Sequence, residues 1–121
     1  MWYKVCLARQ PLRLKDGGMD GIELQIDRNG TSANVQVTGE IDLTSAPRLD
    51  DEVTGLIEDA VSDLTIGLGA VSFMDSTGLR VLLKASKLLE SMGGTLVLNQ
   101  PSEPVRRLLE VSGLDTHFRI S

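Results

Sequence analysis

The segment 75–79, with the sequence Asp-Ser-Thr-Gly-Leu, holds the side chains of this protein that are best placed for chemistry. An alternating apolar pattern before it predicts a strand, and apolar residues at helical spacing after it predict a helix. A hydroxyl at such a turn is exposed, and a phosphate on it would meet the unpaired amides and positive end of the helix. Ser76 is therefore a candidate phosphorylation site. The alternative is that Ser76 serves only as the N-cap of the helix.

Glu40 and Asp42 lie two positions apart at the predicted end of a strand, and with Asp75 they are candidate acid–base or metal-binding groups. No histidine accompanies them, and their spacing does not match a calcium-binding loop. Solvated loop carboxylates are the more common arrangement, because Asp and Glu are rarely buried without a partner. We therefore expect no metal and no cofactor at these positions.

Other catalytic patterns are missing from the sequence. Gly-x-Ser-x-Gly is absent, and the only base available to a serine nucleophile is His117, close to the last residue. No glycine-rich loop of the P-loop or dinucleotide-binding type occurs. Cys6 has no evident neighbour that would activate it, so we interpret it as a plain apolar side chain. The sequence predicts no catalytic residues and a protein that is not an enzyme.

Composition narrows the classes further. The chain has 121 residues, with 12 Lys and Arg against 17 Asp and Glu, for a net charge of −5. This balance argues against a nucleic-acid surface, and the length suits one domain. Residues 1–10 lack the apolar core of a signal peptide, and no window is long and apolar enough to span a membrane. We expect a soluble, cytoplasmic protein that binds neither nucleic acid nor membrane.

The predicted elements follow the order strand, strand, helix, strand, helix, strand, helix, strand. After an initial hairpin the strands alternate with helices, which predicts parallel crossovers and a mixed sheet. The first two strands are expected at 22–26 and 33–37, around a turn at Asn29-Gly30. A helix capped by Thr44 or Ser45 should follow and run to about Ala60, and then a strand at 63–69 and a helix at about 76–92. The last elements are a strand at 95–98 that is covered on both faces, a helix from Ser102 to Gly113 and an edge strand at 117–120.

Residues 1–20 are the least regular part, and we interpret them as an N-terminal extension, packed on the domain or partly disordered. Residues 21–121 then form the single domain. In its first helix Arg48 and the acidic residues around it are expected to face water. Gly67, Gly69 and Gly78 are expected to make room for contact between helices and sheet.

Four segments together resemble a known family: 39–46 (Gly-Glu-Ile-Asp-Leu-Thr-Ser-Ala), 73–79 (Phe-Met-Asp-Ser-Thr-Gly-Leu), 93–94 (Gly-Gly) and 111–114 (Val-Ser-Gly-Leu). In order and spacing they resemble the STAS domain, and most closely the bacterial anti-sigma factor antagonists. The resemblance covers about residues 22–120. It implies an α/β fold, a single STAS-like domain with a four- to five-stranded mixed β-sheet flanked by about three α-helices.

The resemblance also implies a mechanism called partner switching, which regulates sigma-factor-dependent transcription in stress responses. The unphosphorylated protein binds an anti-sigma factor that is also a serine kinase. That kinase phosphorylates the first hydroxyl after the Asp, here Ser76, with Thr77 as a secondary candidate, and the complex separates. A serine phosphatase restores the first form. The implied protein is a monomer or weak dimer.

The partner-binding residues that the resemblance implies are Asp42, Thr44, Asp75, Ser76, Thr77, Gly78, Leu79 and Arg80. Crossovers of one hand should bring Asp42 and Ser76 to the same edge of the sheet, where Asp42 would matter for binding rather than for stability. Arg80 stands where many relatives have a small residue, which could alter partner choice or provide a partner for a phosphate on Ser76.

Two other functions fit the same resemblance. One is a STAS accessory subunit of an ABC-type transporter, for instance of lipids, and the other is a structural module of a larger signalling assembly. Neither needs a phosphorylatable turn, so the Asp-Ser-Thr sequence at 75–77 favours the antagonist.

Overall fold

Alternating apolar residues build the first two strands of the sheet. In β1 (Ile22–Asn29) and β2 (Ser32–Ile41) every second side chain is largely buried, and the two strands pair antiparallel. Gly30 turns the chain between them with a φ of 65°, a left-handed conformation that suits glycine in a tight hairpin. The computed structural model describes residues 21–121. Our interpretations of the N-terminal extension, of Cys6 and of a missing signal peptide lie outside the described residues.

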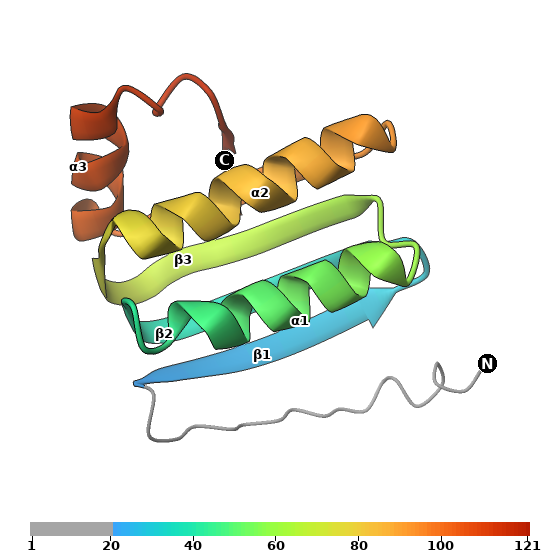
Figure 1. The fold of residues 1–121 in the computed structure, drawn as a ribbon, viewed down its shortest axis with the longest axis horizontal. Helices are drawn as coiled ribbons and strands as arrows, with labels where there is room; N and C mark the ends of the chain where they lie inside the picture. The colour runs from blue at the N-terminus through green and yellow to red at the C-terminus, as the bar shows by residue number, and fades with distance from the viewer. Residues whose placement is uncertain (1–20) are drawn as a thin grey trace.

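The remaining elements alternate along the chain as predicted. They are α1 (Ala46–Glu58), β3 (Asp63–Met74), α2 (Ser76–Ser91), β4 (Thr95–Asn99), α3 (Glu103–Ser112) and β5 (Arg119–Ile120). The five strands lie in the order β1-β2-β3-β4-β5, and all neighbours after the first pair are parallel. Figure 1 shows β1, β2 and β3 side by side. This confirms the mixed sheet, because each of the three parallel pairs needs a crossover connection, which a helix supplies in every case.

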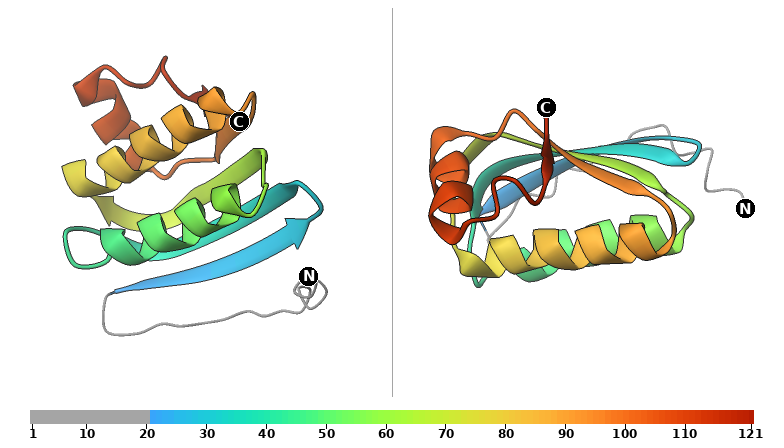
Figure 2. Two further views of the ribbon diagram at one scale, coloured as in Figure 1. Left: turned by 45° about the vertical axis from the view of Figure 1, so that its right-hand side comes forward. Right: turned by 90° about the horizontal axis from the view of Figure 1, so that it is seen from above.

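The helices are distributed unevenly over the sheet. α1 and α2 lie side by side on one face, while α3 packs at the end of the sheet near the start of α2 (Figure 2). The core lies between α1, α2 and the sheet, and β2 presents polar residues such as Asn34 and Gln36 on the opposite, open face. β4 alternates between buried and half-buried residues, because one of its faces lies toward the core and the other toward the open face. The prediction that β4 is covered fully on both faces was therefore wrong.

Several element limits differ from the predictions: β1 and β2 are longer and β5 is shorter than expected, and β3 and α1 also end elsewhere. β3 continues past Gly69 to Met74, because its last residues keep pairing with β2 across an irregularity in the register. α1 ends at Glu58, since Ala60 has a φ of 75° that no α-helix accommodates. Arg48 is half-buried rather than fully solvated, and its guanidinium donates a hydrogen bond of 2.7 Å to the carbonyl of Ile22.

The glycines near the site have different neighbours. A Cβ at Gly78 would lie 2.6 Å from Met74 Cγ and 2.7 Å from Ile41 Cγ2, so this glycine does let the first turn of α2 approach the sheet. At Gly67 the space is filled by the Gln36 side chain, and at Gly69 the nearest atom belongs to a loop carbonyl. The prediction of helix–sheet contact was right for Gly78 and wrong for the other two.

We expect Gly78→Ala to lower the free energy of unfolding by about 1–3 kcal/mol, because the added methyl group overpacks the contact with Met74 and Ile41. Chemical denaturation measures the change. Gly55→Ala is the matched control, since a Cβ there meets nothing within 4 Å inside α1 and should stabilise the helix by about 0.5–1 kcal/mol. Equal stability of both variants would show that the close approach at Gly78 is not required.

Candidate phosphorylation and partner-binding site

Two loops meet at the carboxyl edge of the parallel strands. β2 and β3 end opposite each other at Ile41 and Met74, and the amide of Asp75 donates a hydrogen bond of 3.2 Å to the carbonyl of Ile41. The loop that begins with Asp42 and the turn that begins with Asp75 therefore start side by side. This agrees with the expectation that the two segments share one edge of the sheet.

Asp75 is the N-cap of α2. Its backbone is extended, with φ −113° and ψ −168°, and its Oδ1 accepts a hydrogen bond of 2.9 Å from the amide of Thr77. The Thr77 hydroxyl donates a second, short hydrogen bond to the same oxygen. Ser76 is the first residue of the helix proper. The alternative interpretation of Ser76 as the N-cap was wrong, because the preceding carboxylate satisfies the first-turn amide that a cap must satisfy.

The carboxylate of Asp75 is held in its charged form. The hydrogen bond from the Thr77 side chain is the main cause that lowers the pKa of Asp75 below its model-peptide value of 3.8. Backbone hydrogen bonds from Thr77 and Gly78 act in the same direction, while partial desolvation opposes them. A fixed negative charge therefore stands next to Ser76 at neutral pH.

The two hydroxyls of the turn differ in availability. Ser76 is exposed, and within residues 21–121 its hydroxyl makes no hydrogen bond. Thr77 is half-buried and its hydroxyl is committed to Asp75. The Ser76 hydroxyl can therefore react with an external group without the loss of an internal hydrogen bond, whereas the Thr77 hydroxyl cannot.

Asp42 has a structural role that the sequence analysis missed. Its Oδ1 accepts hydrogen bonds from the amides of Thr44 and Ser45, at 3.0 and 3.1 Å, so it supports the start of α1. The Ser45 hydroxyl is buried and donates to the carbonyl of Glu40 at 2.7 Å. The interpretation of Asp42 as a solvated loop carboxylate was wrong, and removal of its side chain should cost stability as well as any contact with a partner.

Gly78 and Leu79 lie beneath the turn. Both are buried in the core, and only 7% of Leu79 is exposed. They support the first turn of α2 from below and offer almost no surface to another molecule. Thr44 and Arg80, by contrast, are exposed.

A groove between the first turns of α1 and α2 adds residues that sequence reasoning did not identify. It has a volume of about 320 Å³ and is lined by Leu43, Ala46, Pro47, Asp50, Thr77, Arg80, Val81 and Lys84. Lys84 Nζ and Asp50 Oδ2, at 3.2 Å, link its two walls. Leu43 is 74% exposed, although it is a large apolar side chain. The sequence did contain one signal for this groove. Leu43 is apolar, yet it lies between Asp42 and α1, outside the apolar face of that helix.

Comparison with known proteins decides the family. Residues 23–121 match the STAS domain. The chain belongs to the STAS domain family. It is 39% identical over 100 residues to a Bacillus subtilis (strain 168) protein named anti-sigma-B factor antagonist, and the alignment covers 83% of this chain and 91% of that protein.

Solved structures of STAS relatives share the fold. A crystal structure of an anti-sigma factor antagonist from Mycobacterium paratuberculosis superposes with a TM-score of 0.75 at 29% identity, covering 85% of this chain and 87% of the other. The anti-sigma factor antagonist SpoIIAA in its unphosphorylated form superposes with a TM-score of 0.72 at 25% identity, covering 81% and 87%. The overall fold of this chain is therefore shared with both structures.

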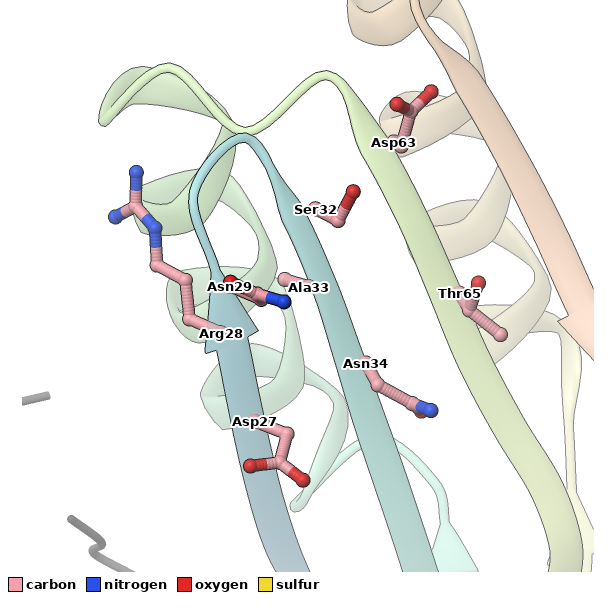
Figure 3. Close-up of a pocket in the computed structure, with 8 residues that line it drawn as sticks. All are labelled: Asp27, Arg28, Asn29, Ser32, Ala33, Asn34, Asp63 and Thr65. Atoms are coloured by element: carbon pink, nitrogen blue, oxygen red, sulfur yellow. The ribbon is translucent and has the colours of Figure 1, made fainter. Parts of the chain in front are cut away.

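A second hollow of this STAS domain lies at the opposite edge of the strands. It measures about 560 Å³ and is polar, with Asp27, Asn34 and Thr65 on the open face of the sheet (Figure 3). Arg28 also lines it, and its Nη1 lies 2.6 Å from Asp59 Oδ2, just after α1. Residues 21–121 contain no group of three or more side chains that could hold a metal ion.

None of the helices within residues 21–121 is long and apolar enough to cross a membrane.

The cap at Asp75 predicts a pH-dependent stability. Asp75→Ala should lower the free energy of unfolding by about 1 kcal/mol at pH 7, because the Thr77 amide loses its acceptor. The pKa of Asp75 is lower in the folded protein than in the unfolded chain. The extra stability of the wild type over Asp75→Ala is therefore complete above about pH 4, and it is lost as the pH falls through the pKa of the folded protein. Urea denaturation between pH 2.5 and 7 measures it.

Two controls accompany this test. Asp75→Asn keeps an acceptor oxygen and should lose less stability, and Asp51→Ala, at an exposed position of α1, should change little. A deficit of Asp75→Ala that grows on acidification would contradict the charged cap.

Proposed function

We propose that this STAS domain is an anti-sigma factor antagonist that works by partner switching. In the unphosphorylated form it binds an anti-sigma factor through the edge that carries Ser76 and the groove between α1 and α2. The serine kinase activity of that factor transfers the γ-phosphoryl group of ATP to the Ser76 oxygen. ADP leaves, and the serine proton passes to a base of the kinase. A serine phosphatase later hydrolyses the ester.

The availability of Ser76 is the observation that carries this proposal. The hydroxyl is exposed and forms no hydrogen bond with any residue of 21–121, while the neighbouring Asp75 and Thr77 are fixed to each other. A kinase can therefore engage Ser76 without opening the helix. Two relatives support the same conclusion. One is named anti-sigma-B factor antagonist, and the other, the anti-sigma factor antagonist SpoIIAA, has a solved structure of its unphosphorylated form.

Phosphorylation at this position is compatible with the fold. A phosphate adds about −1.5 to −2 charges, and the first turn of a helix tolerates negative charge because of its dipole. The domain should remain folded, while the surface beside Ser76 gains charge next to the fixed carboxylate of Asp75. Like charges brought together at an interface cost several kcal/mol, so the complex is the species that phosphorylation destabilises.

The domain acts by binding rather than by catalysis in this proposal. The groove offers an exposed apolar side chain, Leu43, beside the charged residues Arg80 and Lys84. Such a surface, with an apolar centre and a charged rim, is typical of protein interfaces. The partner supplies the kinase active site.

Kinase labelling tests the phosphorylation site. We expect incubation with the cognate kinase and ATP to add one phosphoryl group, which peptide mapping locates at Ser76. Ser76→Ala should abolish the label, whereas Thr77→Ser should leave it at Ser76, because position 77 keeps its hydrogen bond to Asp75. Full labelling of Ser76→Ala, or label at position 77, would refute the assignment.

The groove predicts a separate effect on binding. Leu43→Gln should weaken the complex with the anti-sigma factor about fivefold or more, because truncating an interface anchor typically costs above 1 kcal/mol. Its thermal midpoint should stay within a few degrees, since the side chain is already exposed. Val111→Gln, at an 81% exposed position of α3, is the matched control and should bind as the wild type does. Calorimetric titration that finds both variants equal would exclude Leu43 from the interface.

A further inference from the structure

Arg80 lies one helical turn after Ser76 on the exposed surface of α2. Residues four apart on a helix are neighbours, and the rise between them is about 6 Å, within reach of a guanidinium on its flexible stem. Both side chains are exposed, so neither needs to leave the core for the two to meet.

The carboxylate that caps the turn and the charged residues that line the groove besides Arg80 are already engaged. The carboxylate of Asp75 accepts the two hydrogen bonds from Thr77. Lys84 is paired with Asp50 at 3.2 Å, and it stands about 12 Å along the helix from Ser76. Arg80 forms no ion pair within the described part of the chain. It is the cation of the groove that remains available.

We propose that Arg80 is shared between two anions: a carboxylate of the anti-sigma factor in the unphosphorylated complex, and the phosphate of Ser76 after phosphorylation. This inference rests on the proposed function. The planar guanidinium suits both partners, because it donates paired hydrogen bonds to carboxylate and phosphate oxygens alike. A phosphate on Ser76 would therefore bind the Arg80 guanidinium, which is then no longer available to the carboxylate of the partner.

The charge of the groove supports a carboxylate as the partner's group. Two cations, Arg80 and Lys84, and one anion, Asp50, line it. Because Lys84 and Asp50 compensate each other, the net positive charge resides on Arg80. A phosphate of about −2 beside it reverses the sign of this surface. The same phosphate stands next to the ionised Asp75, so a nearby cation also relieves repulsion within the domain.

The phosphate itself reports on the pairing without any partner or kinase. Phosphoserine is introduced at position 76 of the full chain by nonsense suppression, and ³¹P NMR follows its second ionisation between pH 4 and 8. We expect the pKa of the phosphate to rise by about 0.5 unit in Arg80→Gln, as the loss of a charge-assisted pair at i,i+4 spacing implies. Lys87→Gln, an exposed cation farther along α2, should match the parent. Equal values for Arg80→Gln and its parent would overturn the proposal.

A second measurement addresses the complex. Unphosphorylated Arg80→Gln should bind the anti-sigma factor about tenfold more weakly, with a smaller salt dependence, and Lys87→Gln should bind normally. Wild-type affinity and salt dependence of Arg80→Gln would also overturn the proposal. If instead the kinase does not label Ser76, the proposed function fails, while the NMR result still decides whether Arg80 pairs with a phosphate there.

Discussion

The paired hydrogen bonds between Asp75 and Thr77 are the interaction on which the site depends. They end β3, start α2 and occupy the threonine hydroxyl, which leaves Ser76 as the available one. The backbone hydrogen bond from Asp75 to Ile41 ties this turn to the end of β2. After Ile41 the chain enters the Asp42 loop, whose carboxylate accepts hydrogen bonds from the amides of Thr44 and Ser45, just before α1. Two carboxylates that follow neighbouring strand ends, the N-cap Asp75 and the loop residue Asp42, thus hold the segments that lead into α2 and α1.

Rigidity beneath the turn determines what kind of switch it can be. Gly78 and Leu79 are packed into the core, so the first turn of α2 has little freedom to unwind. A modification of Ser76 must then act through charge and shape at the surface. In the proposed function, phosphorylation of Ser76 would therefore change partner binding without a rearrangement of the domain. Arg80, exposed one turn along, is placed to carry that change in charge to the groove.

The sequence predicted the order of elements and the position of Ser76, because alternation, helical spacing and the Asp-Ser-Thr-Gly-Leu turn are local signals. It did not predict which residue caps α2, since Asp75, Ser76 and Thr77 are all good caps and only the extended backbone of Asp75 decides. The hydrogen bonds of Asp42 and the pairing of Lys84 with Asp50 depend on contacts between separate segments. Gly67 was misassigned because its neighbour, Gln36, comes from another strand.

The affinity of one anti-sigma factor for the serine and phosphoserine forms of this chain tests the central claim most directly. Both forms are titrated by calorimetry, and their thermal midpoints are recorded on the same samples. The account predicts a loss of affinity of about 100-fold or more on phosphorylation, as like-charge contact of several kcal/mol implies, with midpoints within a few degrees. Equal affinities, or a loss of binding that accompanies unfolding of the phosphorylated domain, would contradict it.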